Sequence, residues 1–131
     1  MDKATRRELS QYLALGQSAF YVLTGIWPIF SIGTFQKVTG PKTDLWLVKT
    51  AGTLITVIGS VIGLAGYRRR VSPEIGLLAV GCAAGLAAID VVYVAKKRIS
   101  PIYLLDAIAE GGLIALWALV WPTEKEGKEG R

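Results

Sequence analysis

Long apolar stretches alternate with short polar segments along this chain. Four of the apolar stretches span residues 12–30, 45–67, 75–95 and 102–121. Each has about the 20 residues that a helix needs to cross the hydrocarbon core of a bilayer. The segments between them hold turn-forming and charged residues, as in "RRRVSPE" and "KKRISP". The pattern predicts an all-α, polytopic membrane protein that folds as an antiparallel bundle of four transmembrane helices.

The polar segments also indicate where helices begin. Ser72 and Ser100 each precede a proline. This order is typical of a helix N-terminus, because serine caps free N–H groups and proline has none to lose there. The stretch "GTFQKVTGPKTD", residues 33–44, is expected to be a loop. Residues 1–122 are therefore expected to form one transmembrane domain, and residues 123–131 a polar, disordered tail.

Charge fits this interpretation. Of the 131 residues 52% are apolar and 19% are charged, with a net charge of +5. Lysine and arginine commonly flank membrane helices, where they direct insertion and meet anionic lipids, so they do not indicate a nucleic-acid partner. More of them fall on the inner side when both termini are cytoplasmic. We expect a multi-pass protein of the inner (plasma) membrane, with both termini cytoplasmic and membrane lipids around it.

Two residue types that often carry catalysis are scarce. The chain has no histidine and one cysteine. Imidazole metal ligands and Ser–His triads are therefore absent from the sequence. An acid–base reaction on a lipid-soluble substrate would need no histidine, but no motif supports one. The sequence does not favour an enzyme and specifies no cofactor.

Polar residues within the expected helices follow one face of each, on a wheel of 100° per residue. Lys49, Asp90 and Asp106 lie at a similar depth near the outer helix ends, with Glu110 one turn deeper. A charge at the membrane centre costs roughly 2.5–3.5 kcal/mol on insertion scales, so these groups are expected to face inward. The candidate ligand- or ion-binding residues of this layer are Tyr21, Lys49, Thr53, Asp90, Tyr103, Asp106 and Glu110.

The charges of this layer do not balance. Lys49 can neutralise one carboxylate, most simply Asp90 or Asp106, which leaves an acidic surplus. A proton held by Glu110 would reduce the surplus. A bound cation, either a metal ion or an organic amine, would do the same. Both explanations stay open at the level of the sequence.

Small residues suggest a further contact. The segment "GCAAG" places Gly81 and Gly85 four residues apart, roughly opposite Asp90 on the third expected helix. This spacing lets helix backbones approach closely in membranes. It predicts a contact with a neighbouring helix or a homodimer through Gly81 and Gly85.

The acidic last helix, "ISPIYLLDAIAEGGLIALWALVW", and its three short-looped predecessors resemble the small bacterial membrane proteins of the DoxX-like group. The likeness covers the second to fourth expected helices and rests on glycine spacing and a carboxylate near an apolar terminus. It implies a compact four-helix protein of the bacterial inner membrane and carries over no functional residue. Small multidrug transporters are of similar size, but their membrane carboxylate lies in the first helix, where this chain has none.

Three functions fit these features. The first is binding of a lipid-like or cationic small ligand, since such sites combine a few polar groups with apolar walls. The second is a small proton- or cation-coupled transporter that acts as a dimer, with Glu110 exchanging a proton. The third is a structural or accessory subunit of a membrane complex, in which the charged layer only fixes helix register.

Overall fold

The computed structural model describes residues 2–122. These residues form five helices and no strand, which confirms the all-α prediction. The helices are α1 (Lys3–Phe30), α2 (Ile32–Thr39), α3 (Leu45–Tyr67), α4 (Pro73–Ala95) and α5 (Tyr103–Leu119). Within this part of the chain α1, α3 and α4 are long and apolar enough to cross a membrane.

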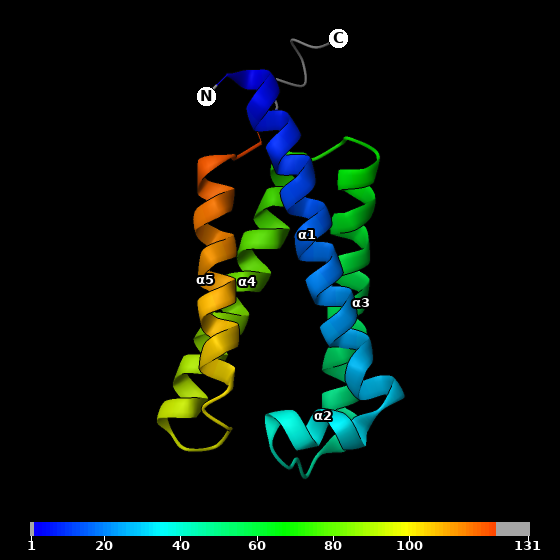
Figure 1. The fold of residues 1–131 in the computed structure, drawn as a ribbon, viewed down its shortest axis with the longest axis vertical. Coiled ribbons are helices and arrows are strands. Elements are labelled where there is room, and N and C mark those ends of the chain that lie inside the picture. The colour runs from blue at the N-terminus through cyan, green and yellow to red at the C-terminus, as the bar shows by residue number, and fades with distance from the viewer. Residues whose placement is uncertain (1, 123–131) are drawn as a thin grey trace.

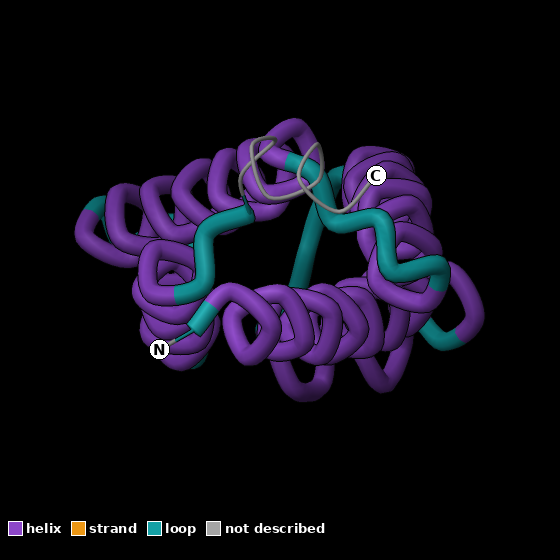
Figure 2. Tube along the Cα trace, turned by 90° about the horizontal axis from the view of Figure 1, so that it is seen from above, coloured by secondary structure: helices purple, strands orange, loops and turns teal. Residues whose placement is uncertain are grey.

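The long helices form two antiparallel pairs, α1 with α3 and α4 with α5 (Figure 1). Seen along their length, they stand around a central axis (Figure 2). The pairs lie close together at the end that carries the N-terminus and diverge toward the end that carries α2 (Figure 1). At the close end Ala14, Ile62, Ala79 and Trp117 form a buried apolar core. That core joins the two pairs.

Glycines let α1 and α3 lie backbone against backbone. A Cβ added to Gly25 would come within 2.6 Å of the Gly52 carbonyl oxygen, and one on Gly59 within 2.7 Å of the Tyr21 Cβ. The buried face of α3 is therefore its glycine face, and Thr53 is exposed. Its hydroxyl donates to the Lys49 carbonyl at 2.8 Å, so it needs no partner on another helix.

Side-chain caps begin α1 and α4. Ser72 accepts a hydrogen bond from the Ile75 N–H at 3.3 Å and begins α4, as its sequence context predicts. Asp2 caps α1 by accepting from the Thr5 N–H at 2.7 Å, and this bond lowers the pKa of the Asp2 carboxyl. Because of that cap, α1 begins about two turns before the apolar stretch that starts at residue 12.

Helix α2 occupies part of the segment for which the sequence predicts a loop. Phe35 lies edge-on to Trp27 of α1, with ring centroids 5.4 Å apart. The expected loop of residues 33–44 includes both Gly33 and Gly40, but Gly33 lies inside the helix. Gly40, with φ of 98°, ends it. The apolar contact with α1 therefore outweighs the local preference of Gly33 for a turn.

Candidate functional site

Buried polar contacts join α1 to the other pair. The Tyr21 hydroxyl donates to Glu110 Oε2 on α5 at 2.7 Å, and both side chains are 1% exposed. One turn earlier, Gln17 donates to the Ala79 carbonyl of α4 at 3.1 Å and accepts from Trp117 Nε1 at 2.7 Å. Unpaired polar groups are costly in a medium without water, so these bonds fix how the two pairs meet.

Asp90 on α4 is buried without a full set of partners. It is 5% exposed, and within residues 2–122 its Oδ2 is the buried side-chain polar atom that has no hydrogen-bond partner. Asp106, the carboxylate at the same level of the neighbouring helix, acts on Asp90 through space, and so does Glu110. Two ionised carboxylates cannot donate to each other, so the pair needs a proton or an external donor.

Antiparallel packing explains why these acids meet. Asp90 lies near the C-terminus of α4, and Asp106 lies in the first turn of α5. The hairpin places both at the same level, with Glu110 one turn further along α5. We call Tyr21, Asp90, Asp106 and Glu110 the acidic cluster.

Other candidate residues lie elsewhere. Lys49 and Thr53 are exposed on α3, away from its buried glycine face, so Lys49 is not the buried counter-ion that the sequence suggests. A lysine near a helix end keeps its ammonium at the surface at little cost. Tyr103, at the start of α5, is half-buried, and its ring faces Lys42 Nζ at 5.1 Å. Gly81 and Gly85 are exposed, with open space where a Cβ would lie.

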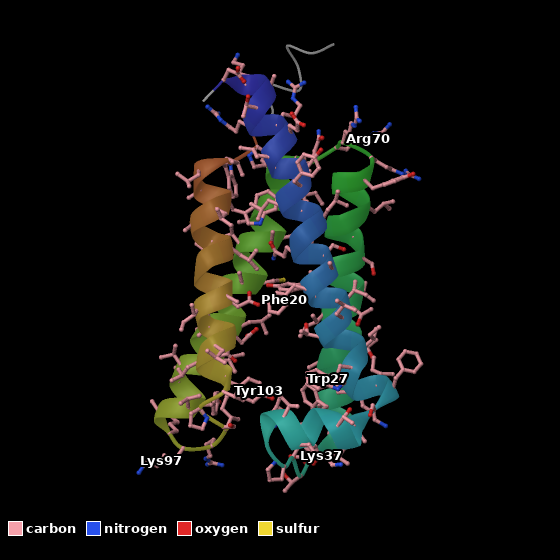
Figure 3. The ribbon with its side chains drawn as sticks, viewed as in Figure 1. Phe20, Trp27, Lys37, Arg70, Lys97 and Tyr103 are labelled. Carbon is pink, nitrogen blue, oxygen red and sulfur yellow. The ribbon has the colours of Figure 1, made fainter. Side chains whose placement is uncertain are left out.

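Three contributing residues are absent from the sequence-based candidates. Gln17 and Trp117 had a detectable signal, since they share helix faces with Tyr21 and Glu110 at spacings of four and seven. No sequence signal indicated Lys42, because it lies in the connection between α2 and α3. Its ammonium donates to the carbonyls of Thr39 and Gly40 at 3.0 and 2.8 Å and holds the α2–α3 connection against Tyr103. Figure 3 shows Tyr103 at the same end as Lys37 and Lys97.

The chemistry open to the acidic cluster is limited. Within residues 2–122 no three histidine, cysteine, aspartate or glutamate side chains are grouped so that they could hold a metal ion. The hydroxyl of Tyr21 already donates its hydrogen bond to one carboxylate oxygen of Glu110. What the arrangement offers is a buried negative charge that a proton or an organic cation can neutralise.

Comparison of the chain with known protein families, with curated proteins and with solved structures finds no match. The acidic cluster is therefore interpreted from its own geometry.

Proposed function

We propose that this chain is a four-span protein of the bacterial inner membrane, similar in design to the DoxX-like proteins, that binds a cationic amphiphile. Helix α5 has 17 residues, and Val120 and Trp121 extend its apolar run. Its length of roughly 25 Å approaches the hydrocarbon thickness of about 30 Å. Pairing with α4 along its length supports the assignment of α5 as the fourth span.

The observation that carries the binding proposal is the unpartnered Oδ2 of Asp90. A carboxylate oxygen at 5% residue exposure is costly unless a donor reaches it. Lys49, which the charge balance of the sequence assigns to this role, is exposed on α3. The acidic surplus is thus larger than the sequence alone suggests. An ammonium group would supply both a donor and the missing positive charge.

The shape of the bundle supports a ligand with an apolar body. The core around Trp117 closes one end of the bundle, while the two pairs diverge at the end where Tyr103 and Trp27 lie (Figures 1 and 3). An amphiphile would enter from this end, with its cation at Asp90 and Asp106. Its apolar part would contact helix faces and lipid tails.

Titration with a long-chain primary alkylammonium cation, which carries both the charge and N–H donors, tests this proposal. Binding to the purified protein in neutral detergent would be followed by isothermal calorimetry. Asp90→Asn should weaken binding at least roughly tenfold, because a contact with a charged group contributes about 1.5–3 kcal/mol. Two matched controls are Asp44→Asn, an exposed carboxylate before α3, and Lys49→Gln, and both should bind as the wild type does.

Three outcomes would contradict the proposal. The first is a wild type that does not distinguish the cation from a neutral analogue of the same size. The second is unchanged affinity in folded Asp90→Asn. The third is a loss in Asp44→Asn as large as that in Asp90→Asn, which would mean that the charge acts only at the surface.

Cation- or proton-coupled transport is a second candidate. The Tyr21–Glu110 hydrogen bond links α1 of one pair to α5 of the other, so a change in the charge of Glu110 acts directly on a contact between the pairs. In proteoliposomes a transporter would accumulate the cation in response to a proton gradient, and Glu110→Gln would abolish uptake. A dimer through Gly81 and Gly85 would fit this candidate, because both are exposed on α4.

A further inference from the structure

A second polar site lies at the opposite end of the bundle from α2. A hollow of about 520 Å³ is lined by Ala4, Arg7, Glu8, Gln11, Tyr12 and Arg69. It lies between the first turns of α1 and the α3–α4 turn, at the end where Figure 3 shows Arg70. Its volume falls within the range of small-molecule sites, about 300–1,000 Å³.

Helix α1 is longer than the hydrocarbon core is thick, and this places the hollow at the membrane surface. Twenty-eight residues extend for roughly 42 Å, about 12 Å more than the hydrocarbon core. The charged residues of α1 all lie before Leu9, so the excess length is at its N-terminal end. Tyr12 is 63% exposed, as is common for tyrosine at the headgroup level. A ligand in the hollow would therefore meet lipid headgroups on one side and water on the other.

Arg69 reaches this hollow from an unfavourable backbone position. Its φ is 58°, in the left-handed region where glycine is usual. The Arg69 and Arg70 N–H groups bond to the carbonyls of Gly66 and Ala65, at 3.2 and 2.8 Å, and close α3 with a Schellman-type turn. Arginine is thus present where glycine would relieve strain, and such outliers concentrate where a side chain is needed.

The charges fit an anionic headgroup. Among residues 2–122 the lining has two guanidinium groups and one carboxylate, an excess of one positive charge. Guanidinium binds phosphate oxygens through paired hydrogen bonds, and a phosphodiester carries one negative charge. The carboxylate of Glu8 and the amide of Gln11 add acceptors for headgroup hydroxyls.

We propose that Arg7, Arg69, Gln11 and Glu8 form a site for the singly charged phosphodiester headgroup of a lipid such as phosphatidylglycerol. This site is separate from the acidic cluster and does not depend on the function proposed for it. It anchors α1 and the α3–α4 turn to the lipid surface.

Arg69→Gly tests the proposal because it separates stability from binding. It should raise the melting temperature of the lipid-free protein by roughly 2 to 6 °C by relieving the left-handed arginine. It should also weaken binding of phosphatidylglycerol roughly fivefold, measured by native mass spectrometry of the full chain. Lys97→Gly is the matched control, since Lys97 also has φ of 58° but lies at the other end of the bundle (Figure 3). Lys97→Gly should raise the melting temperature and leave the affinity for phosphatidylglycerol unchanged.

Each remaining result would overturn the proposal. Equal binding of phosphatidylglycerol and phosphatidylcholine by the wild type would show that no headgroup is recognised. If Arg69→Gly bound phosphatidylglycerol as tightly as the wild type does, Arg69 would not contribute to a lipid site. If Lys97→Gly lost as much affinity as Arg69→Gly, the lipid would be attracted by the overall positive charge of the protein and not by this site. Stabilisation by inorganic phosphate alone, equal to that by the lipid, would identify a free-anion site instead.

Discussion

At the scale of single residues, the Tyr21–Glu110 hydrogen bond is a contact that one substitution removes cleanly. Tyr21→Phe keeps the ring and takes away the donor to Glu110 Oε2. Both groups are buried, and removing one partner of a buried hydrogen bond costs about 1–3 kcal/mol. We expect the free energy of unfolding to fall by that amount, measured by denaturant titration in detergent.

Tyr67→Phe is the control for this substitution, because Tyr67 is 79% exposed. It should leave the free energy of unfolding within about 0.5 kcal/mol of the wild type. Equal effects of the two substitutions would show that the hydroxyl–carboxylate bond does not hold the two helix pairs together.

At the scale of elements, the contact between α1 and α3 depends on glycine. A Cβ at Gly25 would press on the Gly52 carbonyl and on the Thr56 N–H at 2.6 and 2.9 Å, and backbone atoms cannot rotate away. Gly25→Ala should therefore force the helices apart and lower stability by about 1–3 kcal/mol. The measurement is the melting temperature in detergent.

Gly16→Ala provides the comparison on the same helix. Nothing lies within 4 Å of a Cβ added there, and alanine favours a helix over glycine by about 1 kcal/mol. We expect unchanged or higher stability. A loss as large as that of Gly25→Ala would mean that the cost is a property of α1 itself and not of its contact with α3.

The elements also show how far the sequence could be interpreted. Apolar length was sufficient to place the long helices, because a stretch of that composition has few other structures open to it. Apolar length did not show which face of α3 packs inside the bundle. Thr53 and its neighbours align on one face, but their hydroxyls bond to their own helix, so polarity does not indicate an inward face. The glycines of α3 mark that face instead, because they let the backbones of α1 and α3 approach closely.

The same distinction applies to the acidic cluster. Asp90, Asp106 and Glu110 could be grouped from sequence because a carboxylate deep in an apolar helix has few alternatives to the interior. Lys49 could not be placed in this way, since a long side chain near a helix end keeps its charge in water wherever the helix faces. The position of Lys42 depended on the path of a connection, for which periodicity carries no information.

At the scale of the whole molecule, the proposed four spans require both termini on one side of the membrane. Figure 1 shows the N-terminus and the end of α5 at the same end of the bundle, opposite α2. Figure 3 shows Arg70 at that end and Lys97 at the other. Cytoplasmic termini then place the "RRR" turn inside and the "KKR" turn outside, and the basic residues of the N-terminus and tail add to the inner side.

Cysteine labelling tests this topology, because Cys82 is the one native cysteine and Cys82→Ala gives a clean background. In intact cells an impermeant maleimide should label Lys97→Cys but neither Arg70→Cys nor Gly127→Cys. The last two should label only after the membrane is opened. Labelling of both Arg70→Cys and Gly127→Cys from outside, with Lys97→Cys unlabelled, would reverse the orientation. Labelling of both Lys97→Cys and Gly127→Cys from outside would mean that α5 does not cross, and the acidic cluster would then lie beside a surface helix rather than inside a four-span bundle.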